Sequence, residues 1–177
     1  MLKKVEVKIE GLTGLLMHAF PMDGGANESK MTPEQQAERA AYRDPDTKNL
    51  YIPGVAIQRC LVKAAAYSKG KGRASLQKSA AACLLVSPER VSLDTKNYAI
   101  DCRPVVIAAT KGRVLRYRPR LDHWVVEFAL EFDDALLSEK ECRRIVDDAG
   151  SRVGLLDFRP ERSGPFGRFI VQRWGNN

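Results

Sequence analysis

The sequence lacks the features of several common protein classes. Its 177 residues contain no CxxC pair, four scattered cysteines and only two histidines, so a structural zinc site with closely spaced paired ligands is not expected. No apolar run approaches the roughly 20 residues needed to span a bilayer, and the N-terminus alternates charge where a secretion signal would be apolar. We therefore expect a soluble cytoplasmic protein of one domain (1–177), with no cofactor, metal or membrane partner.

Acidic residues are missing from two separate segments. The net charge is +7, and residues 54–88 and 103–120 each carry six basic residues and no acidic one. Two such segments repel each other unless water or an anionic partner separates them, and a polyphosphate chain is the commonest such partner. The alternative is a solvated basic surface that binds nothing. We favour the binding of single-stranded RNA or DNA by charge, with base stacking in support and little sequence preference.

The candidate nucleic-acid-binding residues lie in a helix, a glycine-rich turn, an arginine-rich strand and a late loop. In an extended strand, Arg116, Arg118 and Arg120 share one face and Arg113 lies on the other. The alternatives are an edge strand protected by charge, an exposed turn without a ligand, and an aromatic ring that packs in the core instead of on a base. The full set is Arg59, Lys63, Lys69, Lys71, Arg73, Lys111, Arg113, Arg116, Arg118, Arg120, Arg159, Arg162, Phe166 and Arg168.

Hydrophobic periodicity predicts an α+β fold. Apolar residues alternate in 5–9 and most strictly in 124–132, which is typical of half-buried strands. The order of elements is βαββαβ, which indicates a ferredoxin-like or modified RNA-recognition fold whose antiparallel sheet has one open face. In such folds the open face commonly stacks single-stranded nucleic acid. The predicted helices are 55–67, 74–85 and 138–150; the other predicted strands are 105–109, 113–118, 155–158 and 168–174.

Two segments are predicted to decorate this fold. Residues 21–50 form a flexible, helical insertion, in which Thr32 begins a helix and Gln35 completes a capping box. Residues 103–120 form a basic ribbon. Ser138 and Glu141 predict a second capping box, and Trp124 is expected to pack in the core.

Two motifs resemble those of a known family. Residues 51–65 read Tyr-Ile-Pro-Gly-Val-Ala-Ile-Gln-Arg-Cys-Leu-Val-Lys-Ala-Ala, and a late stretch reads Gly154-Leu-Leu-Asp-Phe-Arg-Pro and Gly164-Pro-Phe-Gly-Arg-Phe. They resemble the helix start and the glycine-rich loop of the repeat-associated mysterious proteins (RAMPs), the RNA-binding backbone subunits of CRISPR effectors, although Val55 stands where that family has serine. The resemblance implies a modified RNA-recognition fold, binding along a single-stranded RNA backbone, and head-to-tail assembly into a filament.

Few residues point to catalysis. His18 lies in a short apolar stretch after the first strand, and Asp101, Asp122 and Asp157 are isolated in the sequence. Because no paired carboxylates or nucleophile–base spacing accompany them, we expect a binding protein and not an enzyme. The alternatives are a metal-independent endoribonuclease of a related fold that uses His18, a phage or mobile-element single-stranded DNA-binding protein, and a protein-interaction module that docks onto a nucleoprotein complex.

Overall fold

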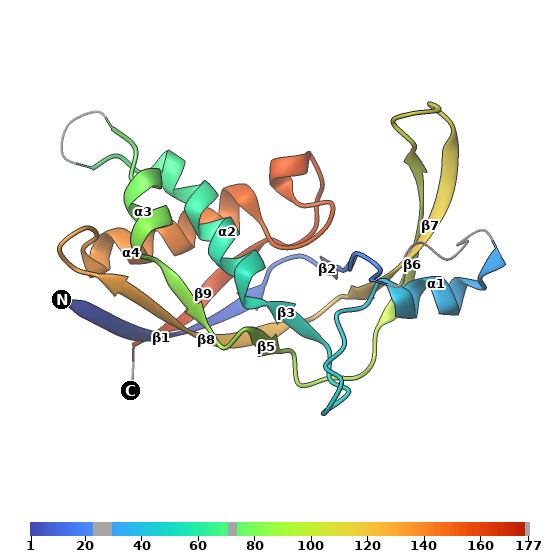
Figure 1. Cartoon of the computed structure of the whole chain (residues 1–177), viewed down its shortest axis with the longest axis horizontal. Helices are drawn as coiled ribbons and strands as arrows, with labels where there is room; N and C mark the ends of the chain where they lie inside the picture. Colours follow the sequence, from blue (N-terminus) through green and yellow to red (C-terminus); the bar gives the residue numbers. More distant parts are fainter. Residues whose placement is uncertain (23–29, 71–73, 176–177) are drawn as a thin grey trace.

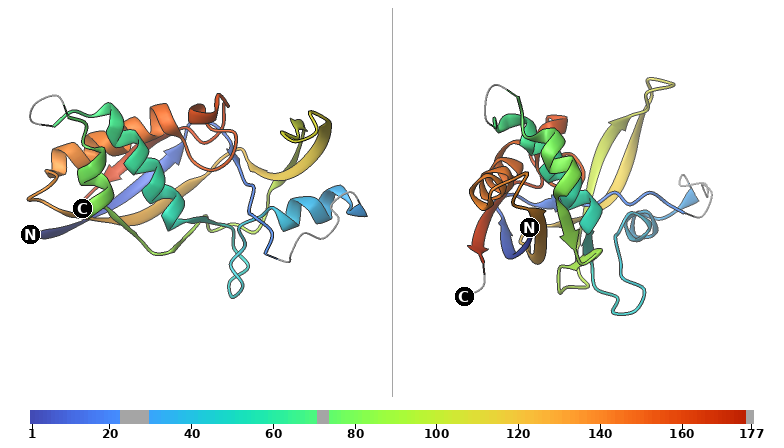
Figure 2. Two further views of the ribbon diagram at one scale, coloured as in Figure 1. Left: turned by 45° about the horizontal axis from the view of Figure 1, so that its top comes forward. Right: turned by 60° about the vertical axis from the view of Figure 1, so that its left-hand side comes forward.

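Helices cover one face of a four-stranded antiparallel sheet in the computed structural model, which describes residues 1–22, 30–70 and 74–175 (Figures 1 and 2). The strand order is β4 (Leu85–Ser87), β8 (Val125–Asp133), β1 (Leu2–Gly11) and β9 (Phe169–Trp174). With α2 (Gly54–Ala64) between β1 and β4, and α4 (Glu139–Asp148) between β8 and β9, this is the ferredoxin-like βαββαβ pattern. The predicted fold class is confirmed.

The core lies between this sheet and the helices. Val7 and Ile9 of β1 are buried, as are Phe128 and Leu130 of β8, because period-two alternation directs them to the helical face. On the helix side, α2 and α4 contribute Ile57, Leu61, Ile145 and Val146. Trp124 packs in the core as predicted: its indole N–H donates to the Thr13 carbonyl and its ring meets Phe169 edge-on.

The open face of the sheet carries ion pairs of both signs. Glu127 of β8 lies 3.0 Å from Lys8 of β1 and 3.0 Å from Arg173 of β9, and Lys4 approaches Glu131. Phe128 and Phe132, the aromatic residues of the two central strands, point into the core. These strands therefore offer no ring for base stacking on the open face, where the fold class had led us to expect it.

A two-stranded ribbon projects from one end of the molecule (Figure 1). It consists of β6 (Ala99–Val106) and β7 (Arg113–Leu121), which pairs at its base with β2 (Leu15–Leu16). A further small sheet joins β3 (Tyr51–Pro53) to β5 (Arg90–Ser92). The predicted strand 105–109 is thus a different element: its first residues end β6, and the main sheet takes the short β4 as its second strand instead.

The helix starts follow their capping sequences. Both predicted capping boxes are present, at Thr32 for α1 (Pro33–Arg39) and at Ser138 for α4. The second predicted helix is shorter than expected, α3 (Gln77–Cys83). Short helical turns are η2 (Ala65–Tyr67), η3 (Ala149–Val153) and η4 (Pro160–Arg162). None of the helices in the described part of the chain has both the length and the apolar composition of a bilayer span.

The predicted strand 155–158 is wrong. The chain there is a tight loop, because Gly154, Leu156 and Phe158 have φ values of 76°, 60° and 47°, which a strand does not allow.

Candidate nucleic-acid interface

A cleft of about 590 Å³ lies between α2 and the loop that follows η3. One wall is a helical stripe, in which Ala56, Arg59, Cys60 and Lys63 recur at spacings of three and four residues. The helix can begin at once after β3 because Gly54 has no side chain: a Cβ there would meet the Pro88 carbonyl oxygen at 2.7 Å. The start of α2 and its basic residues are thereby held at the edge of the cleft.

The other wall is residues 154–168, which fold back on themselves. Gly167 has a φ of 76°, and a Cβ there would lie 2.1 Å from the Leu155 carbonyl oxygen, so only glycine fits this crossing. The fold-back is tied to α2 by a hydrogen bond from the Cys60 thiol to the Gly154 carbonyl, 3.2 Å long. As a result, Arg159 and Arg162 line the same cleft as Arg59 and Lys63.

The four basic residues of the cleft differ in their partners. Glu161 binds two of them, with its carboxylate 2.7 Å from Lys63 Nζ and 2.6 Å from Arg159 Nη2. Burial of the Glu161 carboxyl raises its pKa, but these two cations outweigh that effect and hold the pKa below its usual value. Arg59 and Arg162 are exposed, and neither has a carboxylate partner among the described residues. These two side chains are the ones free to meet a phosphate.

Asp157 lines the cleft and lies between two basic groups, His18 of the cleft and the buried Arg118 behind it. Asp157 Oδ2 accepts from the buried Arg118 guanidinium and lies 3.5 Å from His18 Nδ1. Burial raises the pKa of Asp157, yet the interactions with His18 and Arg118 lower it more, to about 2. The carboxylate is therefore ionised at neutral pH. Tyr42 lines the same cleft, and burial raises the pKa of its hydroxyl, which stays protonated.

The ribbon lies beside the late loop through its arginine-rich face. In the β6–β7 register, Arg116 is opposite Arg103 and Arg118 is opposite Asp101, whereas Arg113 is opposite Val106 on the other face. The predicted division of arginines between faces is confirmed. The Arg103 guanidinium lies over two rings of the late loop, 4.9 Å from the Phe166 centroid and 6.0 Å from the Phe158 centroid.

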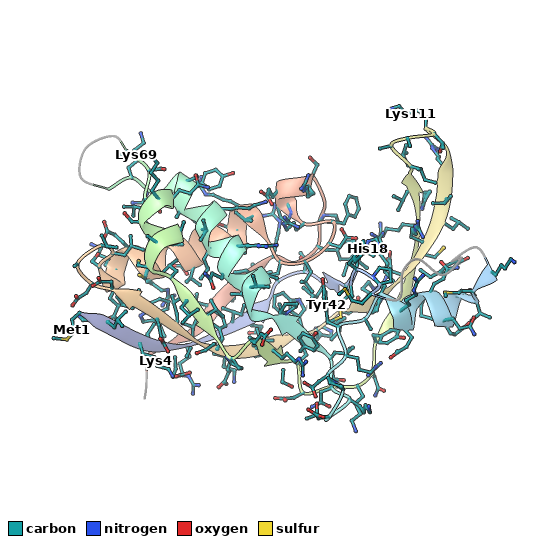
Figure 3. All side chains as sticks on the ribbon, viewed as in Figure 1. Met1, Lys4, His18, Tyr42, Lys69 and Lys111 are labelled. Atoms are coloured by element: carbon teal, nitrogen blue, oxygen red, sulfur yellow. The ribbon has the colours of Figure 1, made fainter. Side chains whose placement is uncertain are left out.

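Several predicted residues lie away from the cleft. Figure 3 places Lys69 and Lys111 at opposite ends of the molecule, with His18 between them. Arg120 is paired with Asp101 and Asp122, and Arg168 donates to the Ser151 carbonyl. Lys71 and Arg73 lie outside the described residues.

The aromatic residue predicted to stack on a base is covered. Phe166 is 8% exposed and lies beneath Arg103, whereas its neighbour Phe158 is 36% exposed. Phe158 is therefore the ring that the loop presents to solvent. Each phenylalanine has an arginine within two positions in the sequence, so only the fold-back of the loop distinguishes the two rings.

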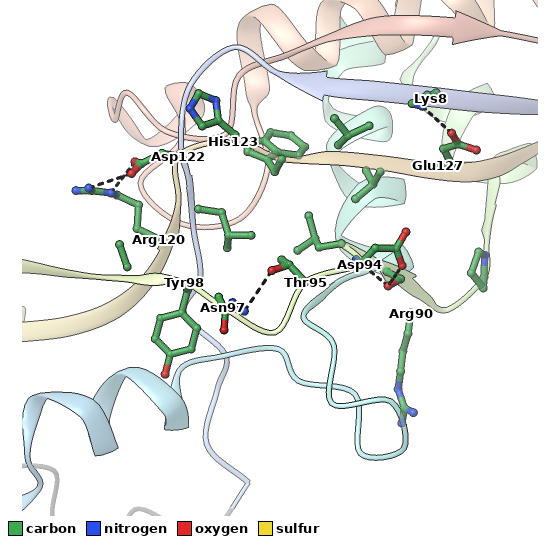
Figure 4. Close-up of a pocket in the computed structure, with 18 residues that line it drawn as sticks. Lys8, Arg90, Asp94, Thr95, Asn97, Tyr98, Arg120, Asp122, His123 and Glu127 are labelled. Atoms are coloured by element: carbon green, nitrogen blue, oxygen red, sulfur yellow. Dashed lines mark hydrogen bonds and ion pairs between the residues drawn. The ribbon is translucent and has the colours of Figure 1, made fainter.

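Sequence reasoning also missed the pairing of His18 with Asp157. Asp157 is isolated in the sequence, and the contact joins the segment after β1 to the late loop, so no local spacing indicates it. A larger hollow of about 990 Å³, shown in Figure 4, lies apart from these residues and contains His123. Its charged lining is mixed: Lys8 pairs with Glu127 and Arg120 with Asp122.

Comparison with known proteins gives a match of fold. No family model matches the chain, and no curated protein matches it. Among solved structures, the chain is similar to a chain in the cryo-EM structure of the Type III-B Cmr-beta bound to cognate target RNA, with a TM-score of 0.55 and 13% identity. The match covers 98% of this chain but 60% of the other, so it spans less than two thirds of that neighbour. At this identity, the match establishes a shared fold.

Proposed function

We propose that this protein binds single-stranded nucleic acid, preferably RNA, in the cleft between α2 and the late loop, with little dependence on base sequence. The observation that carries the proposal is the convergence of Arg59 and Arg162, from distant parts of the chain, on one cleft, where neither has a carboxylate partner among residues 1–22, 30–70 and 74–175. Guanidinium groups bind phosphate bidentately, and two of them across a groove hold a strand by its backbone. Phe158 does not line the cleft but directly follows Asp157, and its exposed ring is a surface on which a base of the bound strand can stack.

We further propose that the protein is RAMP-like and acts within a multi-subunit nucleoprotein complex of the CRISPR type. The two motifs that carry the family resemblance, 51–65 and the late glycine-rich loop, form the two walls of the same cleft. The structural neighbour belongs to an RNA-bound Cmr assembly. Both observations support a cleft that follows an RNA strand. Self-association along that strand is what the family resemblance adds to the proposal.

Fluorescence anisotropy with a labelled single strand of about ten nucleotides tests the binding. Wild-type protein should bind the single strand more tightly than a duplex of the same length, and Arg59→Glu with Arg162→Glu should weaken binding at least about tenfold. Lys69→Glu with Lys111→Glu is the matched control, since this double variant makes the same charge change at two positions outside the cleft. If the wild-type protein shows no binding to single strands at low salt, the proposal is wrong.

Light scattering with and without a longer oligonucleotide tests self-association. We expect particle mass to rise in steps of one protomer as the strand lengthens. A strictly monomeric complex at saturation on a long strand would contradict assembly and leave the binding proposal intact.

The His18–Asp157 contact favours a second candidate, a metal-independent endoribonuclease. A histidine oriented by a carboxylate can take the proton from a ribose 2′-hydroxyl, whose oxygen attacks the adjacent phosphate. The 5′-oxygen leaves with a proton from water as a 5′-hydroxyl, and the other product is a 2′,3′-cyclic phosphate. Incubation of end-labelled RNA in chelator separates the candidates. Cleavage by wild type that disappears in His18→Ala would establish the enzyme, and intact RNA would exclude it.

The third candidate is a phage or mobile-element single-stranded DNA-binding protein. It predicts that DNA binds at least as tightly as RNA, so the same anisotropy assay decides it.

A further inference from the structure

We propose that Asp157 makes the cleft selective for RNA over DNA by accepting a hydrogen bond from a ribose 2′-hydroxyl. The inference rests on the proposed function and adds a specificity-determining residue to it. The observation behind it is the place of this residue: Asp157 lines a cleft whose other charged lining residues are cationic, whereas the nearby Glu161 carboxylate is already paired with Lys63 and Arg159. A carboxylate repels the phosphates that those cations attract, so it serves binding only by meeting an uncharged donor on the strand.

The ribose 2′-hydroxyl is the donor that fits this position. It is the group by which proteins distinguish RNA from DNA, and it lies next to the phosphates that Arg59 and Arg162 would hold. Bases also carry donors, but they differ from one nucleotide to the next, whereas every ribose presents the same hydroxyl. A carboxylate acceptor therefore reads the sugar without making binding depend on base sequence.

Asp157 has the geometry for an additional bond. Arg118 and His18 both approach Oδ2, and the Phe158 backbone N–H also contributes a hydrogen bond. A carboxylate offers about four acceptor positions, so three donors leave one position for a ligand. The side chain is 34% exposed, which makes it accessible from the cleft, while the 7% exposed Arg118 side chain fixes it in place. The acceptor is thus both open and held rigid.

The test compares three ligands of one sequence: RNA, 2′-fluoro RNA and DNA. The 2′-fluoro strand keeps a ribose-like sugar shape and cannot donate, so it separates hydrogen-bond donation from sugar conformation. We expect wild-type protein to bind RNA about tenfold more tightly than either other strand, the size of one hydrogen bond to a charged group. In Asp157→Asn, which keeps the shape and removes the charge, the three affinities should come within about threefold, since neutral hydrogen bonds are weaker.

Glu131→Gln is the matched control. It removes one carboxylate that is 35% exposed and paired with Lys4 on the open face of the sheet, so it should leave the RNA-to-DNA ratio unchanged. Equal wild-type affinity for RNA and 2′-fluoro RNA would overturn the inference, as would a full RNA preference in Asp157→Asn. Either result leaves the proposed function standing if wild type binds single strands, whereas absence of all binding would remove both. If Asp157→Asn fails to fold, Asp157→Glu, which keeps the charge and moves the carboxylate by one methylene, takes its place, and a full RNA preference in that variant would likewise overturn the inference.

Discussion

The salt dependence of RNA binding is the most direct measure of how many phosphates the cleft holds. Along α2 the cleft extends to Lys63, so this wall follows the ten helical residues 54–63, which at about 1.5 Å per residue is about 15 Å. Phosphates of an extended single strand lie roughly twice the 3.4 Å duplex rise apart, so about three fit along this wall. For single strands, log K falls with log salt by about 0.7 per phosphate neutralised, which gives a slope of about −2.

This slope is much smaller than the charge of the sequence alone would indicate. Raising salt from about 50 to about 200 mM should weaken binding about 20-fold for three phosphates. If all thirteen basic residues predicted from the sequence bound phosphate, the slope would be about −9 and the loss about 10⁵-fold. The two outcomes are far apart, so the assay distinguishes a localised cleft from a diffuse basic surface.

Arginine-to-alanine variants show which residues contribute to the slope of log K against log salt. Arg59→Ala and Arg162→Ala should each reduce the magnitude of the slope by about 0.7, and together they should leave about one third of it. Lys69→Ala and Arg113→Ala are the controls, because neither residue lines the cleft. The measurement is anisotropy across a salt series with an oligonucleotide short enough for one protomer. The reasoning is refuted if the slope is unchanged in the double variant, or if the controls reduce it equally.

Three further predictions concern the loops and caps. Gly167→Ala should destabilise the protein by about 3 kcal/mol or more, since φ is 76° and the new Cβ would meet a carbonyl oxygen. The control, Gly112→Ala at the ribbon tip, should cost less than about 1 kcal/mol. Equal denaturation midpoints for the two variants would contradict this prediction. Ser138→Ala should cost about 1 kcal/mol in urea denaturation through loss of its capping box, and an unchanged midpoint would refute that role. Phe158→Ala should weaken RNA binding about tenfold and leave stability nearly unchanged, whereas Phe166→Ala should lower stability by about 3 kcal/mol; the reverse pattern would show that Phe166 is the stacking ring.

Local rules predicted those parts of the fold that depend on near neighbours in the chain. Strict alternation in 124–132 marked β8, and the pairs Thr32 with Gln35 and Ser138 with Glu141 marked two helix starts. The sequence pattern did not predict the short β4, because three residues after an alanine-rich helix carry too little periodicity to distinguish a strand from a helix. The loop conformation of 155–158 was not predicted either, because its left-handed residues include Leu156 and Phe158, which have no local preference for that conformation.

Partners of the basic residues were harder to predict than the basic residues themselves. Two pairs were within reach, since alternate residues of a strand share a face: Asp101 lies two positions before Arg103 and Asp122 two positions after Arg120, just outside the acid-free segment. Both acids lie just outside the acid-free segment 103–120, so the charge count of that segment does not include them. Arg120 is therefore neutralised by Asp122, two positions away, and by Asp101 of the neighbouring strand.

The remaining pairs are long-range and decide what the cleft can bind. Arg118 meets Asp157, and Lys63 meets Glu161, so each acid-free segment gains its carboxylate from the late loop. A cation that is already paired with a carboxylate stabilises a bound phosphate less than an unpaired cation does. Counting basic residues along the chain therefore overstates the binding surface. Binding depends on the basic residues of one groove that have no carboxylate partner among the described residues. Here that set is centred on Arg59 and Arg162, which makes a short, directional contact with a strand a better expectation than adhesion over the whole basic surface.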